Sequence, residues 1–293
     1  MKFSQLNRAT ATAFLLSVCL TIAANAETVL DAIHAVQNEL GARVGFYMHD
    51  THTDDFIAYA ENDHFPLNST FKLFACGALL SHVETGTLRL ADIVSLDDLS
   101  IVDYSPAIED AVSAGRLEIP LEEACRMMLS LSDNTAANIV LSKIGGPKGL
   151  TEFMRSFGDK VTRLDRKEPE LNTAAPGDLR DTTTARAAAN SLQKLVLGDV
   201  LLPSSRARLR EWLSAHSVAD ALFRAALPKT WSIDDRTGAG GFGSRSIIAV
   251  IYPPDREPII VALYLTQTNA SFRRRNAAIA RIGRAIVGRI EQQ

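Results

Sequence analysis

The order of the secondary-structure patterns constrains the fold of this chain more than any other sequence feature. Four segments carry the β-branched and aromatic runs that are typical of strands, namely 43–48, 56–60, 245–252 and 259–267. Apolar residues recur at helical spacing in 27–40, and Ser271 can cap a final helix that runs through Ile290. Between the two groups of strands, residues 66–213 are rich in Ala and Leu and indicate helices interrupted by loops.

A sheet assembled from both ends of the chain is the simplest way to pair these strands. The helical block would then form a second lobe inserted between them. The pattern predicts an α+β protein, with a discontinuous α/β domain (27–65 and 214–293) and an all-α domain (66–213). Because ligand sites are often found where two such units meet, we expect a functional site at their junction.

The first 26 residues differ from the rest and predict a secretory signal peptide. Lys2 and Arg8 supply positive charge, 13–24 is largely apolar, and 24–26 (Ala-Asn-Ala) fits a small-x-small cleavage site. A retained membrane anchor is the weaker alternative, because the apolar run is shorter than a spanning helix requires. We therefore expect an exported protein that has no membrane attachment after cleavage.

The balance of charges argues against a nucleic-acid partner. The chain has 31 basic and 34 acidic residues and a net charge of −3, so it has no strongly basic character. The most basic run, 273–275 (Arg-Arg-Arg), is expected to be a solvated face of the final helix.

Two cysteines remain once the signal is removed. Cys19 lies inside the predicted signal, and Cys76 and Cys125 lie in the exported chain. Export makes a disulfide between these two chemically accessible, and a pair of buried free thiols is the alternative.

Ser69 and Lys72 form a pair that suits nucleophilic chemistry. They precede the apolar run 73–80, which indicates a buried helix with Ser69 in its first turn. A spacing of three places both side chains on one helix face. A serine needs an adjacent base to become a nucleophile, and burial favours the neutral form of lysine, which can accept a proton. Alone, the pattern is weak, because a capping serine beside a surface lysine has the same spacing.

Two further motifs are also ambiguous when each is taken alone. Residues 132–134 (Ser-Asp-Asn) open the helical run 135–144 and by themselves indicate a helix N-cap. Residues 236–238 (Arg-Thr-Gly) lead into 239–241 (Ala-Gly-Gly) and by themselves indicate a glycine-rich turn between strands. A phosphate-binding loop is not indicated, because the Gly-Lys-Ser/Thr ending is absent.

Taken in this order, the three motifs resemble those of the class A serine β-lactamases and of their relatives, the penicillin-binding proteins. A fourth stretch, 166–172 (Arg-Lys-Glu-Pro-Glu-Leu-Asn), is similar to the omega loop of class A, with Glu168 as its catalytic carboxylate. The resemblance covers essentially the whole exported chain. It implies a five-stranded antiparallel sheet flanked by the N- and C-terminal helices, with an inserted helical domain. It also implies a periplasmic monomer without cofactor or metal.

The resemblance implies that the chain opens penicillin-type rings through an acyl-enzyme on Ser69. The backbone N–H groups of Ser69 and Ala239 would form the oxyanion hole. Either Lys72, or Glu168 acting through a water, would take the serine proton. Ser132 would pass a proton to the lactam nitrogen as it leaves.

The resemblance also implies the residues that bind substrate and support the site. Glu168 and Asn172 would position the water that hydrolyses the ester, and Asn134 would bind the amide of the substrate side chain. The residues expected at the cleft mouth or around the ring carboxylate are Tyr104, Arg236, Thr237, Gly238 and Arg245. The expected structural pairs are Arg166 with Asp181 and Cys76 with Cys125, and the Glu168–Pro169 bond is a candidate cis peptide.

Arg236 departs from most of the family, which has lysine at this position. Arginine keeps the charge but offers a planar fork of donors instead of a compact ammonium. Together with 240–246 (Gly-Gly-Phe-Gly-Ser-Arg-Ser), this arginine resembles the carbenicillin-hydrolysing subgroup. We therefore expect penicillins, including carboxypenicillins, as substrates, although the residues do not indicate which cation would meet the extra carboxylate.

Three other functions compete with this interpretation. A serine D,D-peptidase would share the first three motifs, but the loop 168–172 argues against it. A penicillin-sensing domain would hang from a membrane segment, and none is expected after signal removal. A metal enzyme would have to use His49 and His52, which lie in a polar stretch, 49–55, where a solvated hairpin turn is favoured.

Overall fold

A five-stranded antiparallel sheet forms the centre of the fold. The computed structural model describes residues 27–97, 99–215 and 218–293, so the predicted signal peptide lies outside the described residues. The strand order is β2-β1-β9-β8-β7, which confirms a sheet built from both ends of the chain. The strands are β1 (Arg43–Asp50), β2 (Asp55–Tyr59), β7 (Ser232–Ala239), β8 (Arg245–Tyr252) and β9 (Ile259–Thr266).

Strand β9 shows that the sheet is covered on both faces. All eight of its residues are buried. Because successive side chains point to opposite faces, Val261 and Leu263 enter one hydrophobic core while Ala262 and Tyr264 enter the other. Burial on both faces explains why this segment is a continuous apolar run without the polar alternation of a half-exposed strand.

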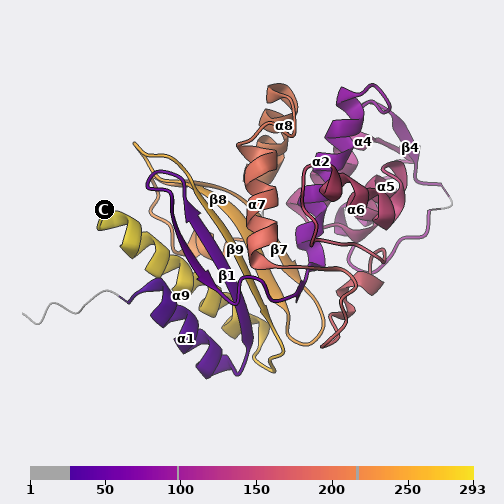
Figure 1. Ribbon diagram of the computed structural model, residues 1–293. Coiled ribbons are helices and arrows are strands. Elements are labelled where there is room, and N and C mark those ends of the chain that lie inside the picture. The colour runs from indigo at the N-terminus through magenta and orange to yellow at the C-terminus, as the bar shows by residue number, and fades with distance from the viewer. Residues whose placement is uncertain (1–26, 98, 216–217) are drawn as a thin grey trace, which may run out of the picture.

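Helices α1 (Val29–Leu40) and α9 (Phe272–Glu291) lie side by side on one face of the sheet, and α7 (Ala185–Val196) covers the other (Figure 1). The caps predicted from sequence set two of the helix ends. Gly41 ends α1 in the left-handed conformation, with φ of 56°, which glycine adopts without steric cost. The Ser271 side chain accepts a hydrogen bond from the Arg274 N–H at the start of α9.

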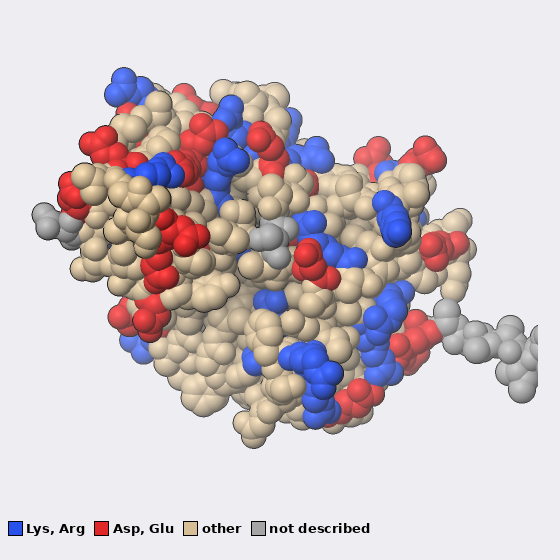
Figure 2. Space-filling view, turned by 180° about the vertical axis from the view of Figure 1, so that it is seen from behind, with Lys and Arg blue, Asp and Glu red and all other residues tan. Residues whose placement is uncertain are grey.

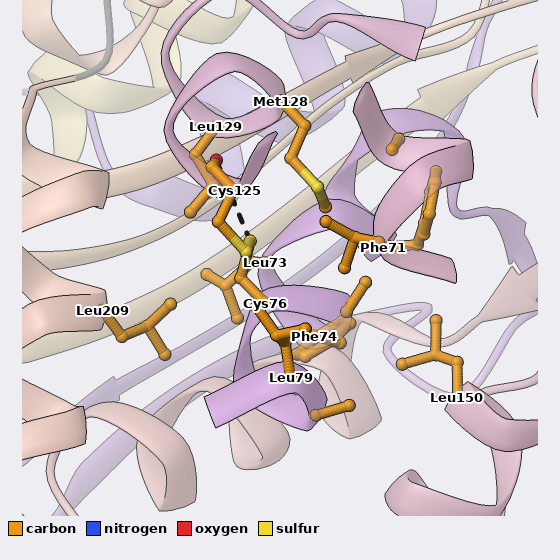
Figure 3. Packing of buried hydrophobic residues seen from close by; sticks show 14 of the residues in the cluster. Phe71, Leu73, Phe74, Cys76, Leu79, Cys125, Met128, Leu129, Leu150 and Leu209 are labelled. Carbon is orange, nitrogen blue, oxygen red and sulfur yellow. Dashed lines mark hydrogen bonds between the residues drawn. A yellow bond between two sulfur atoms is a disulfide. The ribbon is translucent and has the colours of Figure 1, made fainter. Parts of the chain in front are cut away.

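Helix α2 (Phe71–Glu84) is the core of the helical part of the molecule. Its first ten residues, 71–80, are all buried, as the apolar run predicts. Figure 3 shows Phe71, Phe74 and Leu79 on this helix among apolar side chains of the surrounding helices. A helix that is apolar around its whole circumference is stable only when other helices enclose it. The enclosing helices are α4 (Leu121–Ser130), α5 (Asn134–Lys143), α6 (Gly146–Ser156) and α8 (Pro203–Ser214).

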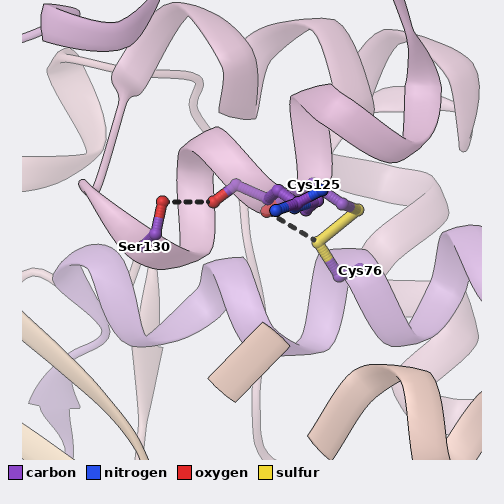
Figure 4. Close-up of a disulfide and its surroundings, with 4 residues drawn as sticks. Cys76, Cys125 and Ser130 are labelled. Carbon is purple, nitrogen blue, oxygen red and sulfur yellow. Dashed lines mark hydrogen bonds between the residues drawn. A yellow bond between two sulfur atoms is a disulfide. The ribbon is translucent and has the colours of Figure 1, made fainter. Parts of the chain in front are cut away.

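A disulfide joins α2 to α4. Cys76 and Cys125 are bonded, with 5.9 Å between their Cα atoms (Figure 4). The bond confirms the disulfide and excludes the alternative of two free thiols.

Short strands interrupt the block that the sequence indicated as helices and loops. Strand β3 (Phe65–Pro66) pairs with β6 (Thr182–Thr183), and β4 (Ile93–Ser95) pairs with β5 (Glu118–Pro120). Strands of two or three residues are too short to carry a periodic pattern, so sequence analysis missed them. The remaining helical elements are α3 (Pro106–Ser113) and the 3-10 turns Asn68–Thr70, Glu170–Thr173 and Phe223–Ala225.

The boundary of the first hairpin also differs from the prediction. His49 and Asp50 belong to β1 and pair with β9, so the turn is confined to residues 51–54. The sequence pattern put them in the turn because they are polar. Among the described residues, no helix has both the length and the hydropathy needed to cross a membrane.

Candidate active site

A cleft of about 280 Å³ lies where the helical part meets strand β7 at the edge of the sheet. Nine of the predicted site residues line it, so segments far apart in sequence meet in one place. Those from the helical part are Ser69, Tyr104, Ser132, Asn134 and Asn172, and those from the sheet edge are Thr237, Gly238, Ala239 and Arg245. Figure 2 shows a face of the molecule that is hollowed near its centre, with Lys or Arg atoms in the hollow.

Ser69 lines this cleft and lies just before the buried helix. It belongs to the 3-10 turn Asn68–Thr70, so the prediction that it lies in the first turn of α2 is wrong by two residues. Its side chain accepts a hydrogen bond from the Ser132 hydroxyl, with 3.0 Å between the oxygens. A Cβ atom on Gly238 would lie 3.0 Å from the Ser69 nitrogen and 2.7 Å from Ser246 Oγ. Only glycine therefore lets strand β7 approach Ser69 this closely.

Lys72 is fully buried and lies among the groups that the mechanism requires. Its Nζ donates to the Ser132 carbonyl at 2.7 Å and to Asn134 Oδ1 at 2.7 Å, and it lies 3.3 Å from Ser132 Oγ. It also forms an ion pair with Glu168 Oε1 at 3.1 Å. Burial lowers the pKa of Lys72 to about 8, against the opposing effect of the Glu168 carboxylate.

The residues 132–134 lie between helices α4 and α5 and serve two purposes. Asp133, and not Ser132, caps α5: its side chain accepts the Ala136 N–H at 2.8 Å. The other carboxylate oxygen accepts two backbone N–H groups of α3. Ser132 has a φ of 64°, a conformation that non-glycine residues adopt only where surrounding contacts impose it. The buried Asp133 thus holds the turn that aims Ser132 at Ser69.

Several contacts hold the Glu168 loop. Arg166 pairs with Asp181, as predicted, with 2.5 Å between Nε and Oδ2. Asn172 Nδ2 donates to Glu168 Oε2 at 2.5 Å, and the Glu168–Pro169 bond is cis. The Glu168 side chain is completely buried, and its Oε1 atom lies 3.1 Å from Lys72 Nζ.

Asn138, which the sequence motifs did not predict as a site residue, binds the same loop from helix α5. Asn138 Nδ2 donates to the Glu168 carbonyl at 2.9 Å, and Asn138 Oδ1 accepts the Glu168 N–H at 3.0 Å. A signal was present: Asn138 follows Asn134 by four residues and shares its helix face.

Arg236 is buried behind the cleft instead of lining it. Its guanidinium donates to the carbonyls of Ser69 and Leu129 and to Ser132 Oγ, the last at 2.6 Å. Burial lowers the pKa of Arg236 to about 10, so the group stays charged at neutral pH. Strand β7 therefore places a cation directly on the hydroxyl that contacts Ser69, and the residues 236–238 are strand, not a turn.

Arg245 is the cation that lines the cleft. Its Nε donates to Asn276 Oδ1 at 2.8 Å and its Nη1 donates to the Gly238 carbonyl at 3.0 Å. Burial is the main reason that the pKa of Arg245 is lowered to about 10. The sequence motifs did not predict Asn276, nor Val218 and Phe272, which line the cleft.

Of the two histidines considered as metal ligands, His52 is exposed in the hairpin turn and His49 has hydrogen-bond partners of its own. His49 contacts Gln193 Oε1 through Nδ1 and Asp54 Oδ1 through Nε2. Within residues 27–97, 99–215 and 218–293, no group of three or more His, Cys, Asp or Glu side chains is placed to hold a metal ion.

Comparison with known proteins agrees with this geometry. A family model described as the beta-lactamase enzyme family matches residues 28–290. The chain is 49% identical over 255 residues to beta-lactamase AER-1 of Aeromonas hydrophila, which covers 87% of this chain and 83% of the relative. It is 44% identical over 270 residues to beta-lactamase PSE-4 of Pseudomonas aeruginosa, covering 92% and 93%.

Solved structures show the same similarity. An ancestral class A beta-lactamase matches with a TM-score of 0.86 and 45% identity, covering 89% of this chain and all of the other. The chromosome-encoded beta-lactamase of Vibrio parahaemolyticus matches with a TM-score of 0.87 and 41% identity, covering 91% and 100%. The chain therefore belongs to the beta-lactamase enzyme family, and within it to class A.

Proposed function

We propose that this β-lactamase hydrolyses penicillins, including carboxypenicillins, through an acyl-enzyme on Ser69 that a water activated by Glu168 clears. The observation that carries the proposal is a continuous chain of short contacts from a hydroxyl to a carboxylate. Ser69 Oγ contacts Ser132 Oγ, Lys72 Nζ lies beside Ser132, and Glu168 pairs with Lys72. A nucleophile, a proton relay and a base are thus linked by short contacts: Ser69 and Ser132 line the cleft, and the other two groups are buried beside it.

In acylation, Ser69 Oγ attacks the lactam carbonyl and forms the ester bond while the carbonyl–nitrogen bond breaks. The N–H groups of Ser69 and Ala239 stabilise the oxyanion. The serine proton passes to Glu168 through a water or to Lys72, and Ser132 delivers a proton to the departing nitrogen. Arg236 supports this last step, because its guanidinium donates to Ser132 Oγ and keeps that hydroxyl oriented.

In deacylation, water attacks the ester carbonyl and Glu168 takes its proton. The bond to Ser69 Oγ breaks, and the oxygen regains a hydrogen. Asn172 orients the Glu168 carboxylate through its 2.5 Å contact, and Asn138 holds the backbone of the same residue. This step separates a β-lactamase from a D,D-peptidase or a penicillin-sensing domain, which lack an effective deacylating base.

The substrate carboxylate would bind at the sheet edge, between Thr237, Gly238 and Arg245. Arg245 lines the cleft and uses two of its five N–H donors on Asn276 and Gly238, so donors remain for a carboxylate. At the other end, Asn134 would bind the amide of the substrate side chain.

The carboxypenicillin part of the proposal rests on Arg236-Thr237-Gly238 and on similarity to the relatives. Exchange of Arg236 for lysine tests it: Arg236→Lys should shift the ratio of kcat/KM for carbenicillin to kcat/KM for benzylpenicillin, because lysine cannot reproduce the planar fork that holds Ser132 Oγ. An unchanged ratio of the two kcat/KM values contradicts the subgroup assignment.

The proposal also includes the cellular location and the organisation of the chain. We expect export to the periplasm and a monomeric state. We also expect a discontinuous α/β domain (27–65 and 214–293) with an inserted all-α domain (66–213). The signal-like composition of residues 1–26 supports export. The disulfide supports it too, because such bonds persist in oxidising compartments.

The central test is turnover of benzylpenicillin, carbenicillin and cefotaxime by the purified protein, with and without a chelator. We expect chelator-independent hydrolysis of the penicillins, and loss of activity in Ser69→Ala. Glu168→Ala should accumulate acyl-enzyme, detected by mass spectrometry, because deacylation loses its base. The matched control is Glu170→Ala, which removes an exposed carboxylate from the same loop. A Glu168→Ala variant that clears its acyl-enzyme as fast as the parent refutes the assigned role.

A further inference from the structure

The first turn of α9 contacts the cation that faces the cleft. Phe272, Arg275 and Asn276 have the spacing that puts them on one helix face. Asn276 accepts a hydrogen bond from Arg245, and Arg275 Nη1 donates to the Ser244 carbonyl at 3.1 Å. Arg275 is therefore partly buried against β8, so the prediction that 273–275 is a uniformly solvated face is wrong for this residue.

Two guanidinium groups share one aromatic ring. The Cζ atoms of Arg245 and Arg275 lie 4.8 Å and 5.3 Å from the centroid of the Phe272 ring. Both distances are within the range in which the negative face of an aromatic ring attracts a cation. Phe272 is 50% exposed and lines the cleft, whereas Arg245 is 3% exposed. The ring therefore forms part of the surface that a bound substrate would meet.

This cluster of positive charge has little else to offset it. Within the described part of the chain, no carboxylate lies at ion-pair distance from Arg245 or Arg275. The first turn of α9 contains no acidic residue, and the positive end of a helix points toward the same region. The nearby positive charge of Arg275 lowers the pKa of Arg245 further. The groups in direct contact with the Arg245 charge before a substrate anion arrives are the ring face and two neutral oxygens, and Asp235 favours the charged form from farther away.

We propose that Phe272 is a positioning residue that holds Arg245 for the carboxylate on the β-lactam substrate, and thereby sets the preference for substrates that carry this carboxylate. The inference rests on the proposed role of Arg245. The ring acts in two ways: its face offsets the charge of Arg245 beside Arg275, and its bulk keeps the guanidinium plane against Gly238. An apolar side chain of similar size would keep the bulk but not the aromatic face, so it would not replace the electrostatic part of this contribution.

The test compares benzylpenicillin with its methyl ester, in which the ring carboxylate is neutral. In Phe272→Leu we expect kcat/KM for the acid to fall by roughly 3- to 30-fold, mainly through a rise in KM. The value for the ester should stay within about twofold of the parent. Phe272→Tyr or Phe272→Trp should keep kcat/KM for the acid near the parental value, because both side chains keep an aromatic face. Phe242→Leu is the matched control, since Phe242 is similarly exposed, lies in the loop before Arg245 and does not line the cleft.

Three outcomes would overturn the inference. A Phe272→Leu variant with parental kinetics on the acid would show that the ring only fills space. Equal losses of kcat/KM on acid and ester would show that the substitution affects the cleft in general. The thermal unfolding temperature of each variant shows whether such a loss comes from partial unfolding instead. Failure to restore activity with Tyr and Trp would exclude the cation–π contact. Failure of the proposed role of Arg245 would give a different result. The parent itself would have equal kcat/KM values for acid and ester, and Arg245→Ala would leave kcat/KM for the acid unchanged.

Discussion

Replacing Asn138 with alanine removes both halves of a reciprocal contact with the Glu168 backbone. The parent makes one hydrogen bond to the carbonyl at 2.9 Å and one from the N–H at 3.0 Å. Each contributes about 1 kcal/mol net, and the buried backbone groups left behind add to the cost. We expect the free energy of unfolding to fall by about 2–4 kcal/mol. Displacement of a catalytic group by about 1 Å can cost about 100-fold in rate, so deacylation should slow by about 10- to 100-fold.

Mass spectrometry of the enzyme quenched during benzylpenicillin turnover measures the acyl-enzyme fraction in this variant. The acylation rate should fall less than the deacylation rate, because Ser69 and Ser132 keep their contacts. Acyl-enzyme should therefore accumulate. Ser142→Ala is the matched control: it removes a 2.7 Å bond from Ser142 to the Ile139 carbonyl within the same helix and leaves the loop untouched. An Asn138→Ala variant with the parental acyl-enzyme fraction and the parental urea midpoint would refute the reasoning.

Two further predictions concern the buried bonds and charges around α2. The Cys76–Cys125 bond closes a loop with a sequence separation of 49. Protein refolded under reducing conditions should therefore lose about 4 kcal/mol of unfolding free energy, measured in urea. Equal urea midpoints with and without reductant would contradict this. The folded-state pKa of Lys72 is about 8 against 10.5 for the free group, so the folded state releases its proton first as pH rises. The unfolding free energy of the parent, relative to Lys72→Met, should therefore increase by about 3 kcal/mol between pH 8 and 10.5, and a pH-independent difference would exclude the depressed pKa.

Local patterns in the sequence determined most of the secondary structure. The segment 245–252 is a strand with the predicted bounds, and Gly41 and Ser271 end or begin their helices as predicted. These features depend on burial period and capping, which a few neighbouring residues control. The division into a discontinuous α/β domain and an all-α domain stays a prediction.

The four motifs identified the candidate site, but only their resemblance to a family made them more than helix caps and turns. Pattern alone put Ser69 inside α2 and assigned the residues 236–238 to a turn, and the structure corrects both. It also shows Arg236 behind the cleft, bonded to Ser132, where the resemblance suggested a direct contact with substrate.

Tertiary structure alone decided which side chains support the reacting groups. Arg236 and Ser132 are 104 residues apart, and Asn138 reaches Glu168 across 30 residues. The contact of Phe272 with Arg245 depends on how α9 packs beside β8. Periodicity reports which face of an element is buried but not which other element covers it, and contacts between distant segments form only when the two cores pack on both faces of the sheet.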